Sequence, residues 1–300
     1  MIATNSLILG TANFGLRYGY AAQGRQLSRD ESLELLSEAI SLGYSGVDTA
    51  AAYGDSEKII GATELPRGLA VHTKIHELKS VKSSELVSRV EKAAKNLKRA
   101  PEIVYFHSSD LLNRLSDHVI AEALRRLLEM GFPTRFGVSI YDPREIPLLL
   151  NRYPSLEAFQ YPANLLTRYH LEKAQVQELQ SRGIHLAVRS LLLQGILGMS
   201  LEELNMSVFT SQETALLQQL HFSCKEQGTS IIDASIKFFI DELGVSVIVG
   251  AHTKAQLIDL SSTPPHPVDF SKLPVAGKEV FDLREKRFDP GLSGPSPTPS

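Results

Sequence analysis

Apolar and polar residues follow one repeated pattern along the chain, in which an amphipathic helical segment ends at glycine and a short apolar run follows. In the first clear copy, Ser28 and Glu31 have the spacing of a capping box, which marks the start of a helix. Gly43 supplies the left-handed residue that ends it. The apolar residues expected on one face of this helix are Leu33, Leu36 and Ile40.

The same pattern recurs at three later places in the chain. Leu124, Leu127 and Leu128 precede Gly131, another helical segment ends near Gly183, and a third covers 231–243 before Gly244. The strand candidates are 7–10, 47–48, 69–74, 103–107, 136–140, 156–160, 184–188 and 245–250. Short, nearly continuous apolar strands alternating with amphipathic helices are typical of a parallel sheet whose faces are covered by helices.

The number of these units predicts the architecture. Eight strand–helix units in about 260 residues fit a closed (β/α)₈ TIM barrel, an α/β fold with a single domain. The alternative is an open doubly wound sheet, which usually carries Gly-x-Gly-x-x-Gly after an early strand, and residues 10–15 have the wrong spacing for it. We therefore predict a barrel with a C-terminal extension over residues 1–285.

Proline and serine accumulate toward the C-terminus, so we expect residues 286–300 to form a disordered tail. The apolar residues before this tail are expected to pack on the barrel as a terminal extension. They include Phe270, Leu273, Val280 and Phe281.

Charge and apolar content restrict the partners. The chain has 31 basic and 34 acidic side chains and a net charge of −3, which argues against nucleic acid as the main partner. No apolar run approaches the length of about 20 residues that a membrane span needs. The N-terminus lacks the features of a secretory signal, so a cytoplasmic location is expected. A small molecule is the expected partner, and no pattern indicates an oligomeric state.

Cysteine and histidine give no metal site. Cys224 is the only cysteine, which excludes an internal disulfide and a multi-cysteine cluster. His72 and His76 would share one strand face with Lys74, but Lys74 is a candidate member of a catalytic group, so no metal site is predicted.

Candidate chemistry gathers where the strands end, which is where a barrel of this type carries its functional groups. Asp48 ends the second strand, Lys74 the third and His107 the fourth, while Tyr53 lies in the loop after the second. We expect these four side chains to share one patch of one face. A lysine that faces the interior of a barrel needs a carboxylate partner, and Asp48 is the candidate.

These four residue types form a coherent proton-donating group. A phenol has a pKa near 10 and is a weak acid, but an adjacent ammonium lowers that pKa. Tyr53 is therefore the candidate proton donor, Lys74 the group that adjusts it, Asp48 the partner of Lys74, and His107 a hydrogen-bond donor to a carbonyl oxygen. None of the four is well placed as a nucleophile, so a nicotinamide hydride is the natural one.

The chain resembles the aldo-keto reductase family from about residue 6 to residue 260. The matching segments are 46–57 (Gly-Val-Asp-Thr-Ala-Ala-Ala-Tyr-Gly-Asp-Ser-Glu) with Gly61, Thr73-Lys74, 105–110, 136–139, Gln160 with Asn164, 194–197 and 247–251. The resemblance implies an NAD(P)H-dependent reductase of aldehydes or ketones that usually prefers NADPH and uses no metal. Asp48, Tyr53, Lys74 and His107 match the catalytic tetrad of the family.

The resemblance also implies a set of cofactor-binding residues. Ser139 and Gln160 match residues that hold the nicotinamide carboxamide, and Gly250 and Thr253 match the loop that receives the adenosine phosphate. The expected cofactor-binding residues are Ser139, Gln160, Arg189, Ser190, Gly250, Thr253, Lys254 and Gln256.

Three positions depart from the family pattern. Ile140 stands where asparagine is common. Arg189 stands where many members place an aromatic ring against the nicotinamide, and a planar guanidinium can stack there instead. Gln256 stands where an arginine often holds the 2′-phosphate, although His252 and Lys254 could supply charge. NADPH is therefore favoured, and NADH remains open.

Two other functions remain as alternatives. Lys74 could form a Schiff base with a carbonyl substrate in a barrel aldolase, or the chain could be a nicotinamide-sensing scaffold without turnover. For a reductase, the absence of tryptophan matters, because many relatives line the substrate pocket with it. With Phe14, Arg17 and Arg189 instead, we expect a more polar pocket and a polar, sugar-like carbonyl substrate.

Overall fold

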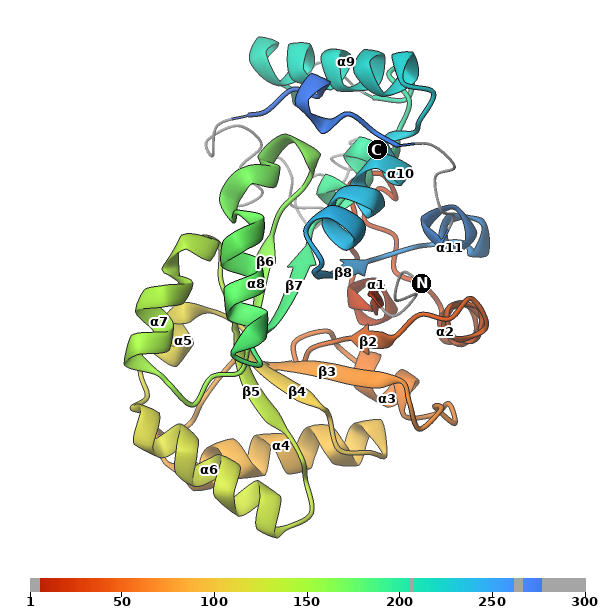
Figure 1. Cartoon of the computed structure of the whole chain (residues 1–300). Helices are drawn as coiled ribbons and strands as arrows, with labels where there is room; N and C mark the ends of the chain where they lie inside the picture. Colours follow the sequence, from red (N-terminus) through yellow and green to blue (C-terminus); the bar gives the residue numbers. More distant parts are fainter. Residues whose placement is uncertain (1–5, 205–207, 262–266, 277–300) are drawn as a thin grey trace, which may run out of the picture.

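Eight parallel strands pair in chain order and close into a barrel, because β8 pairs with β1 (Figure 1). This computed structural model describes residues 6–204, 208–261 and 267–276. The strands are β1 (Leu7–Gly10), β2 (Gly46–Asp48), β3 (Ala70–Ile75), β4 (Ile103–Phe106), β5 (Arg135–Ser139), β6 (Ala158–Pro162), β7 (His185–Arg189) and β8 (Ser246–Val249). The predicted (β/α)₈ fold is confirmed.

Helices alternate with the strands and cover the barrel, and α4 and α6 lie side by side against its outer face in Figure 1. The α-helices are α1 (Ala12–Gly15), α2 (Arg29–Ser41), α3 (Ser56–Ile60), α4 (Ser83–Leu97), α5 (Ser109–Leu112), α6 (Asp117–Glu129), α7 (Ile146–Arg152), α8 (Lys173–Ser181), α9 (Ser211–Glu226), α10 (Ile231–Ile236) and α11 (Lys254–Ser261). Short 3₁₀ segments are η1 (Pro143–Glu145), η2 (Leu165–His170), η3 (Leu193–Gly198) and η6 (Phe270–Lys272). None of these described helices is long and apolar enough to cross a membrane.

Helix α2 begins and ends as its sequence predicts. The Ser28 hydroxyl accepts from the Glu31 amide at 3.3 Å, and the Glu31 carboxylate accepts from the Ser28 amide at 2.8 Å. This reciprocal pair is the predicted capping box. Gly43 follows the helix with φ +81°, a conformation that glycine adopts without steric cost.

The buried faces of two helices differ from those predicted. In α2, Leu36 is buried, whereas Leu33 and Ile40 are only partly buried at the edges of the face. The buried residues of α2 are Ser32, Leu35, Leu36 and Ala39. In α6, Leu127 is buried but Leu128 is 67% exposed. Leu127 faces the barrel, and Leu128, which is turned about 100° away from it around the helix axis, faces solvent.

The predicted continuous helix over 231–243 is wrong in its second half. Regular α-helix ends at Ile236, and a π-helical segment, η5 (Lys237–Glu242), continues from it. Phe238 and Phe239, although adjacent, are both buried, with ring centroids 5.1 Å apart. The wider π turn accompanies this burial of two neighbouring rings.

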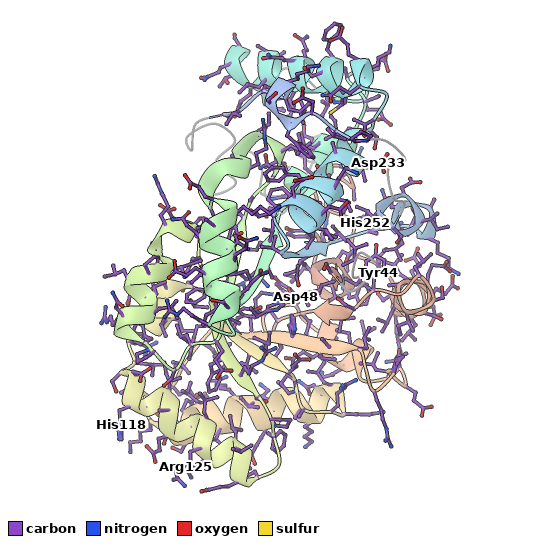
Figure 2. The ribbon with its side chains drawn as sticks, viewed as in Figure 1. Tyr44, Asp48, His118, Arg125, Asp233 and His252 are labelled. Carbon is purple, nitrogen blue, oxygen red and sulfur yellow. The ribbon has the colours of Figure 1, made fainter. Side chains whose placement is uncertain are left out.

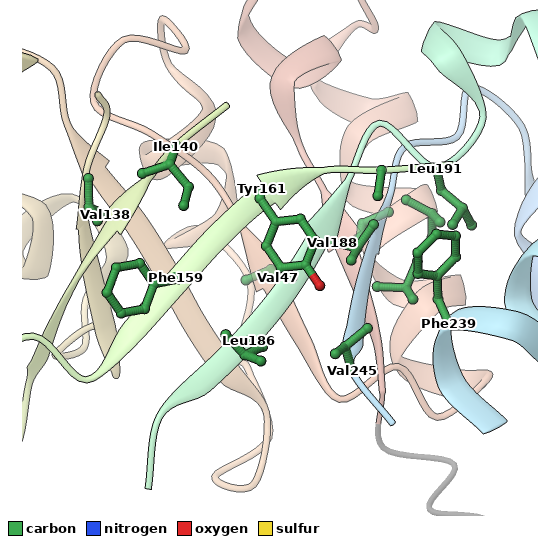
Figure 3. Packing of buried hydrophobic residues seen from close by; sticks show 14 of the residues in the cluster. Val47, Val138, Ile140, Phe159, Tyr161, Leu186, Val188, Leu191, Phe239 and Val245 are labelled. Atoms are coloured by element: carbon green, nitrogen blue, oxygen red, sulfur yellow. The ribbon is translucent and has the colours of Figure 1, made fainter. Parts of the chain in front are cut away.

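Alternation along the strands separates the apolar core from the polar interior. Val138 and Phe159 are buried in the hydrophobic core cluster, and Figure 3 shows them among the other apolar side chains of this cluster. Their neighbours Ser139 and Gln160 face the interior of the barrel and line its cavity. The period of two residues thus places packing on one side of the sheet and candidate chemistry on the other.

A buried arginine attaches the C-terminal segment to the loop after β6. Arg168 is 2% exposed, and its guanidinium donates to backbone carbonyl oxygens on both segments. These acceptors are Leu165, Phe270, Leu273 and Pro274. The predicted packing of Phe270 and Leu273 on the barrel is confirmed. Val280, Phe281 and the predicted tail at 286–300 lie outside the described residues, so the boundary at residue 285 stays a prediction.

Candidate active site

Asp48 and Lys74 meet inside the barrel, where Figure 2 shows Asp48 at the centre of the molecule. Asp48 ends β2 and Lys74 lies in β3, and both are buried at 3% and 2% exposure. The Lys74 ammonium forms an ion pair with Asp48 Oδ1 and also donates to the Thr49 carbonyl at 3.1 Å. The predicted pairing of Lys74 with a carboxylate is therefore present.

Tyr53 and His107 complete the group at the C-terminal ends of the strands. The Tyr53 ring centroid lies 5.4 Å from Lys74 Nζ, and its centroid is 6.1 Å from that of His107, edge to face. His107 directly follows β4, and its amide donates to the Ile75 carbonyl at 2.9 Å. All four predicted catalytic side chains line one cavity.

The turn that carries Tyr53 is held by a close approach of two glycines. A Cβ on Gly15, at the end of α1, would lie 1.8 Å from the Tyr53 carbonyl oxygen. A Cβ on Gly54 would lie 2.6 Å from the Gly15 carbonyl oxygen, and Gly54 has φ +53°. Side chains are thus excluded at both positions, and the backbone of α1 contacts the backbone of the turn that orients Tyr53.

Ser56 and Glu57, which complete the motif after Tyr53, anchor the same turn to neighbouring strands. The Ser56 hydroxyl lies 2.9 Å from both Thr11 Oγ1 and Thr49 Oγ1. Glu57 is 4% exposed, and its carboxylate accepts from the Thr73 hydroxyl at 2.7 Å and from the Asn96 amide at 2.8 Å. Each buried polar group therefore has partners, and the motif positions Tyr53 as well as supplying it.

The electrostatics of Tyr53 differ from the prediction. Burial raises the pKa of Tyr53, the Asp48 carboxylate raises it further, and the cation that lowers it is Arg189. Lys74 was expected to lower the pKa of Tyr53. The net shift is upward instead, because burial is its largest cause and the Asp48 carboxylate adds to it, while the charge of Lys74 is paired with Asp48.

His107 is neutral at physiological pH. Burial lowers its pKa to about 4, and Lys74 and Arg189 lower it as well. Burial in the cavity, with Tyr53 nearby, raises the pKa of Tyr18 to about 12. The hydroxyl and imidazole groups around the Asp48–Lys74 pair are therefore uncharged hydrogen-bonding groups.

Ser139, Gln160 and Arg189 lie at neighbouring strand ends beside these residues. Ser139 and Gln160 are register partners in β5 and β6, and Gln160 Nε2 donates to Asp48 Oδ2 at 2.8 Å. Arg189 ends β7 and its Nε lies 3.4 Å from Ser139 Oγ. Ser190 has φ +61° and lines the same cavity.

The predicted adenosine-phosphate residues divide into two groups. Gly250 and Gln256 line the cavity, whereas Thr253 and Lys254 do not. Lys254 Nζ instead lies 3.4 Å from the Glu34 carboxylate of α2. Gln256 forms hydrogen bonds at the start of α11. Its backbone amide donates to Thr253 Oγ1 at 3.2 Å, and its side-chain Oε1 accepts from the His252 backbone amide at 2.7 Å.

The cavity has a volume of about 620 Å³. Three of its lining residues were not predicted from the sequence, namely Arg25, Tyr141 and Glu203. Tyr141 could have been found, because it lies two residues beyond the end of β5, at the same face of the barrel as His107. Arg25 lies in the loop between α1 and α2, and no pattern predicts its direction. Arg17 and Phe14 were expected in the pocket, but neither lines it. Arg17 is exposed and donates to the Gly24 carbonyl at 3.0 Å, and Phe14 is buried in the hydrophobic core.

A second polar cluster, missed in the sequence, lies in the barrel interior. The His72 ring centroid is 5.4 Å from that of His185 and 6.0 Å from that of Tyr105. Burial lowers the pKa of both histidines, to about 4 for His185. Within the described residues, no group of three or more His, Cys, Asp or Glu side chains is arranged to hold a metal ion.

A closed (β/α)₈ barrel with a paired lysine, a phenol and a neutral imidazole at its C-terminal face defines a small-molecule enzyme of the oxidoreductase class. The chain belongs to the aldo/keto reductase family, whose model matches residues 6–262. This family consists of NAD(P)H-dependent oxidoreductases that act on carbonyl compounds. A comparison with curated protein sequences gives no match.

Solved structures share the fold at low sequence identity. The glycerol dehydrogenase of Gluconobacter oxydans is 18% identical with a TM-score of 0.67, covering 91% of each chain. An aldo-keto reductase of Bacillus halodurans in its holo form is 16% identical with a TM-score of 0.66, covering 89% of this chain and 91% of its own. An aldo-keto reductase of Bombyx mori in complex with NADP is 18% identical with a TM-score of 0.64, covering 89% of this chain and 86% of its own.

Proposed function

We propose that this chain reduces an aldehyde or ketone to an alcohol, with Tyr53 as the general acid and a nicotinamide as the hydride donor. The observation that carries the proposal is the placement of Tyr53 over the Asp48–Lys74 pair, with its ring centroid 5.4 Å from Lys74 Nζ and beside neutral His107. A phenol and an imidazole that face one cavity can both contact a carbonyl oxygen.

The residues at the floor of the cavity fit a nicotinamide. Gln160 Oε1 is buried and has no hydrogen-bond partner among the described residues, while its Nε2 is engaged by Asp48. A carboxamide N–H is the kind of donor that this oxygen lacks. Ser139, the register partner of Gln160, presents a hydroxyl at the same level. We therefore assign Ser139 and Gln160 to the carboxamide, Arg189 and Ser190 to the ring, and Gly250 to the adenosine side.

The protein residues then have separate tasks in the reaction. The bound nicotinamide would supply a hydride to the carbonyl carbon. Tyr53 donates its proton to the carbonyl oxygen, so the C=O π bond breaks as a C–H and an O–H bond form. The raised pKa keeps Tyr53 protonated until a stronger base, the developing alkoxide, takes the proton. His107 donates a hydrogen bond to the same oxygen, and Asp48 holds Lys74 beneath the phenol.

The alternative Schiff-base mechanism fits the geometry poorly. A nucleophilic lysine must be deprotonated and accessible, but Lys74 is 2% exposed and its ammonium is paired with Asp48 and Thr49. A non-catalytic nicotinamide sensor would need neither this ion pair nor a phenol above it.

We propose NADPH as the preferred cofactor and a polar, sugar-like carbonyl compound as the substrate. At the end of the cavity near β8, Arg25 and His252 are in contact, with His252 Nε2 lying 3.2 Å from the Arg25 carbonyl. Arg25 offers a guanidinium to a 2′-phosphate there, in place of an arginine at position 256. The hydroxyl groups of Tyr18 and Tyr141 and the carboxylate of Glu203 also line the cavity, and they suit a polar substrate.

The proposal predicts that Tyr53→Phe removes turnover without removing cofactor binding. We expect kcat/KM for polar aldehydes and ketones with NADPH to fall by about 10²- to 10⁴-fold, because the acid is lost. The dissociation constant of NADPH, measured by fluorescence titration, should change little. Tyr153→Phe is the matched control, because Tyr153 follows α7, donates to Asn113 Oδ1 and does not line the cavity. Unchanged turnover in the Tyr53 variant would contradict the assignment, and a borohydride-trapped adduct on Lys74 would support the aldolase instead.

A further inference from the structure

Arg189 is the cation at the catalytic end of the cavity whose charge is not balanced. Lys74 and Asp48 neutralise each other in a buried ion pair. Tyr18 and Tyr53 have raised pKa values and His107 a lowered one, so all three are uncharged near neutral pH. The charge that remains at this end is therefore the guanidinium of Arg189.

The contacts of Arg189 hold its guanidinium in place without neutralising it. Its Nε lies 3.4 Å from Ser139 Oγ, its Nη2 donates to the Ile140 carbonyl at 3.3 Å, and its Cζ lies 4.9 Å from the Tyr141 ring centroid. All three partners are neutral. Across the described part of the chain, no Asp or Glu carboxylate lies within 4.0 Å of this guanidinium.

Asp259 and Glu203 are the other carboxylates that line the cavity, and among the described residues neither forms an ion pair with Arg189. The Glu203 Oε2 accepts from the Ser200 amide at 2.7 Å, in a turn after η3. Hydrogen bonds from Ser200 are the main cause of the lowered pKa of Glu203, and Arg189 is not among the causes. Arg189 and Glu203 are therefore bound by different groups, and Glu203 does not neutralise the positive electrostatic potential of Arg189 beside Tyr53.

We infer that Arg189 makes this site bind the reduced nicotinamide more tightly than the oxidised one. The inference rests on the proposed function, in which Arg189 is assigned to the nicotinamide ring. The reduced ring is neutral, whereas loss of a hydride leaves a ring with one positive charge; the rest of the dinucleotide is the same in both forms. An aromatic side chain at position 189 would attract a cationic ring, but a guanidinium repels it.

This discrimination has a direct consequence for turnover. Loss of a hydride from a bound nicotinamide would create the ring charge beside Arg189, and this residue would destabilise the oxidised form. The same repulsion favours its release. A tenfold difference between the two dissociation constants raises the two-electron reduction potential of the bound cofactor by about 30 mV relative to the free one.

The test is a pair of calorimetric titrations, one with NADPH and one with NADP⁺, on the full chain and on three variants. Two unit charges about 5 Å apart at an effective dielectric constant of about 20 repel strongly enough to change a binding ratio more than tenfold. We therefore expect Arg189→Met to lower the ratio of the NADP⁺ to the NADPH dissociation constant by at least about tenfold. Arg189→Lys, which keeps the charge, should leave most of the ratio intact.

Arg25→Met is the matched control for removal of a cation from the same cavity. Arg25 lies near β8, where both redox forms present the same groups, so its loss should weaken both forms equally and leave the ratio unchanged. Thermal denaturation of each variant checks that it is folded. An unchanged ratio in Arg189→Met, or an equal shift in Arg25→Met, would overturn the inference while the proposed function stands. Failure of the unmodified chain to bind either form would overturn the proposed function itself.

Discussion

Two buried cations, Lys74 at the centre of the barrel and Arg168 beneath the C-terminal segment, are stabilised in different ways. Each is 2% exposed. Lys74 is paired with a carboxylate, Asp48, whereas Arg168 donates to four backbone carbonyl oxygens from two chain segments. One arrangement joins two strand ends that carry candidate chemistry, and the other joins a loop to the end of the described chain.

The difference follows from the chemistry of the two side chains. A lysine ammonium can change its pKa with its surroundings, and burial lowers the pKa of Lys74 while Asp48 opposes this. A guanidinium stays charged and spreads its donors over a plane, so it can satisfy several carbonyls at once. We therefore expect loss of Lys74 to affect chemistry and stability together, and loss of Arg168 to affect stability alone.

The largest effect is expected for Lys74→Met. The variant leaves the Asp48 carboxylate buried without its ammonium, which should lower the free energy of unfolding by about 3–5 kcal/mol. It also removes the support of Tyr53, so kcat/KM should fall by at least about a hundredfold. Urea denaturation and steady-state assays measure the two effects.

The double variant Asp48→Asn with Lys74→Met separates the two effects. Without a buried charge, most of the lost stability should return, because a neutral pair costs less to bury than a lone carboxylate. Activity should stay low. Recovery of activity together with stability would mean that the ion pair has no role in the chemistry.

Arg168→Met comes next in size and tests the other half of the comparison. The loss of hydrogen bonds to four carbonyls should reduce the free energy of unfolding by about 2–4 kcal/mol. Residues 267–276 should become more sensitive to limited proteolysis, while kcat should stay close to that of the unmodified chain because Arg168 does not line the cavity. The free energy of unfolding of Arg168→Lys should lie between that of Arg168→Met and that of the unmodified chain. A large drop in kcat for a folded Arg168 variant would contradict the expectation that Arg168 affects stability alone.

The fold and the catalytic group were predictable for the same reason. The positions of Asp48, Lys74 and His107 follow from two rules, alternation along a strand and the clustering of strand ends on one barrel face. Local rules also placed the cap at Ser28. These features depend on sequence spacing, which can be read directly.

What could not be predicted depends on distances between segments far apart in the chain. The net pKa shift of Tyr53 depends on how deeply the phenol is buried and on how close the Asp48 carboxylate lies, and sequence spacing shows neither. The engagement of Lys254 by Glu34 joins α11 to α2. The π-helical segment Lys237–Glu242 depends on the packing of neighbouring side chains against the barrel, where helical periodicity alone predicts a regular helix.

Acid should weaken the barrel centre more than the Arg168 region. Burial lowers the pKa of His107 and His185 to about 4 from an ordinary value of 6.5. Because the unfolded chain takes up these protons first, stability is full above pH 6.5 and falls as the pH drops toward 4. At about pH 5 we expect each histidine to cost about 1–2 kcal/mol. In urea denaturation across this range, the free energy of unfolding of His185→Leu should fall less steeply with decreasing pH than that of the unmodified chain. His118→Gln is the control, because His118 lies on the outer surface of α6 (Figure 2).

The smallest effect is expected for Arg25→Met, which extends the comparison to a cation that is not buried. Arg25 is half exposed and pairs with Glu31, so water and a carboxylate both weaken its field. If it contacts a 2′-phosphate, its loss should raise the dissociation constant of NADPH by about tenfold and leave that of NADH nearly unchanged. Titration of both cofactors measures this, with Lys254→Met as the matched control, since Lys254 pairs with Glu34 and does not line the cavity. If Lys254→Met weakens NADPH binding and Arg25→Met does not, the phosphate is held by the loop before α11, and position in the cavity would be the wrong guide to which cation binds it.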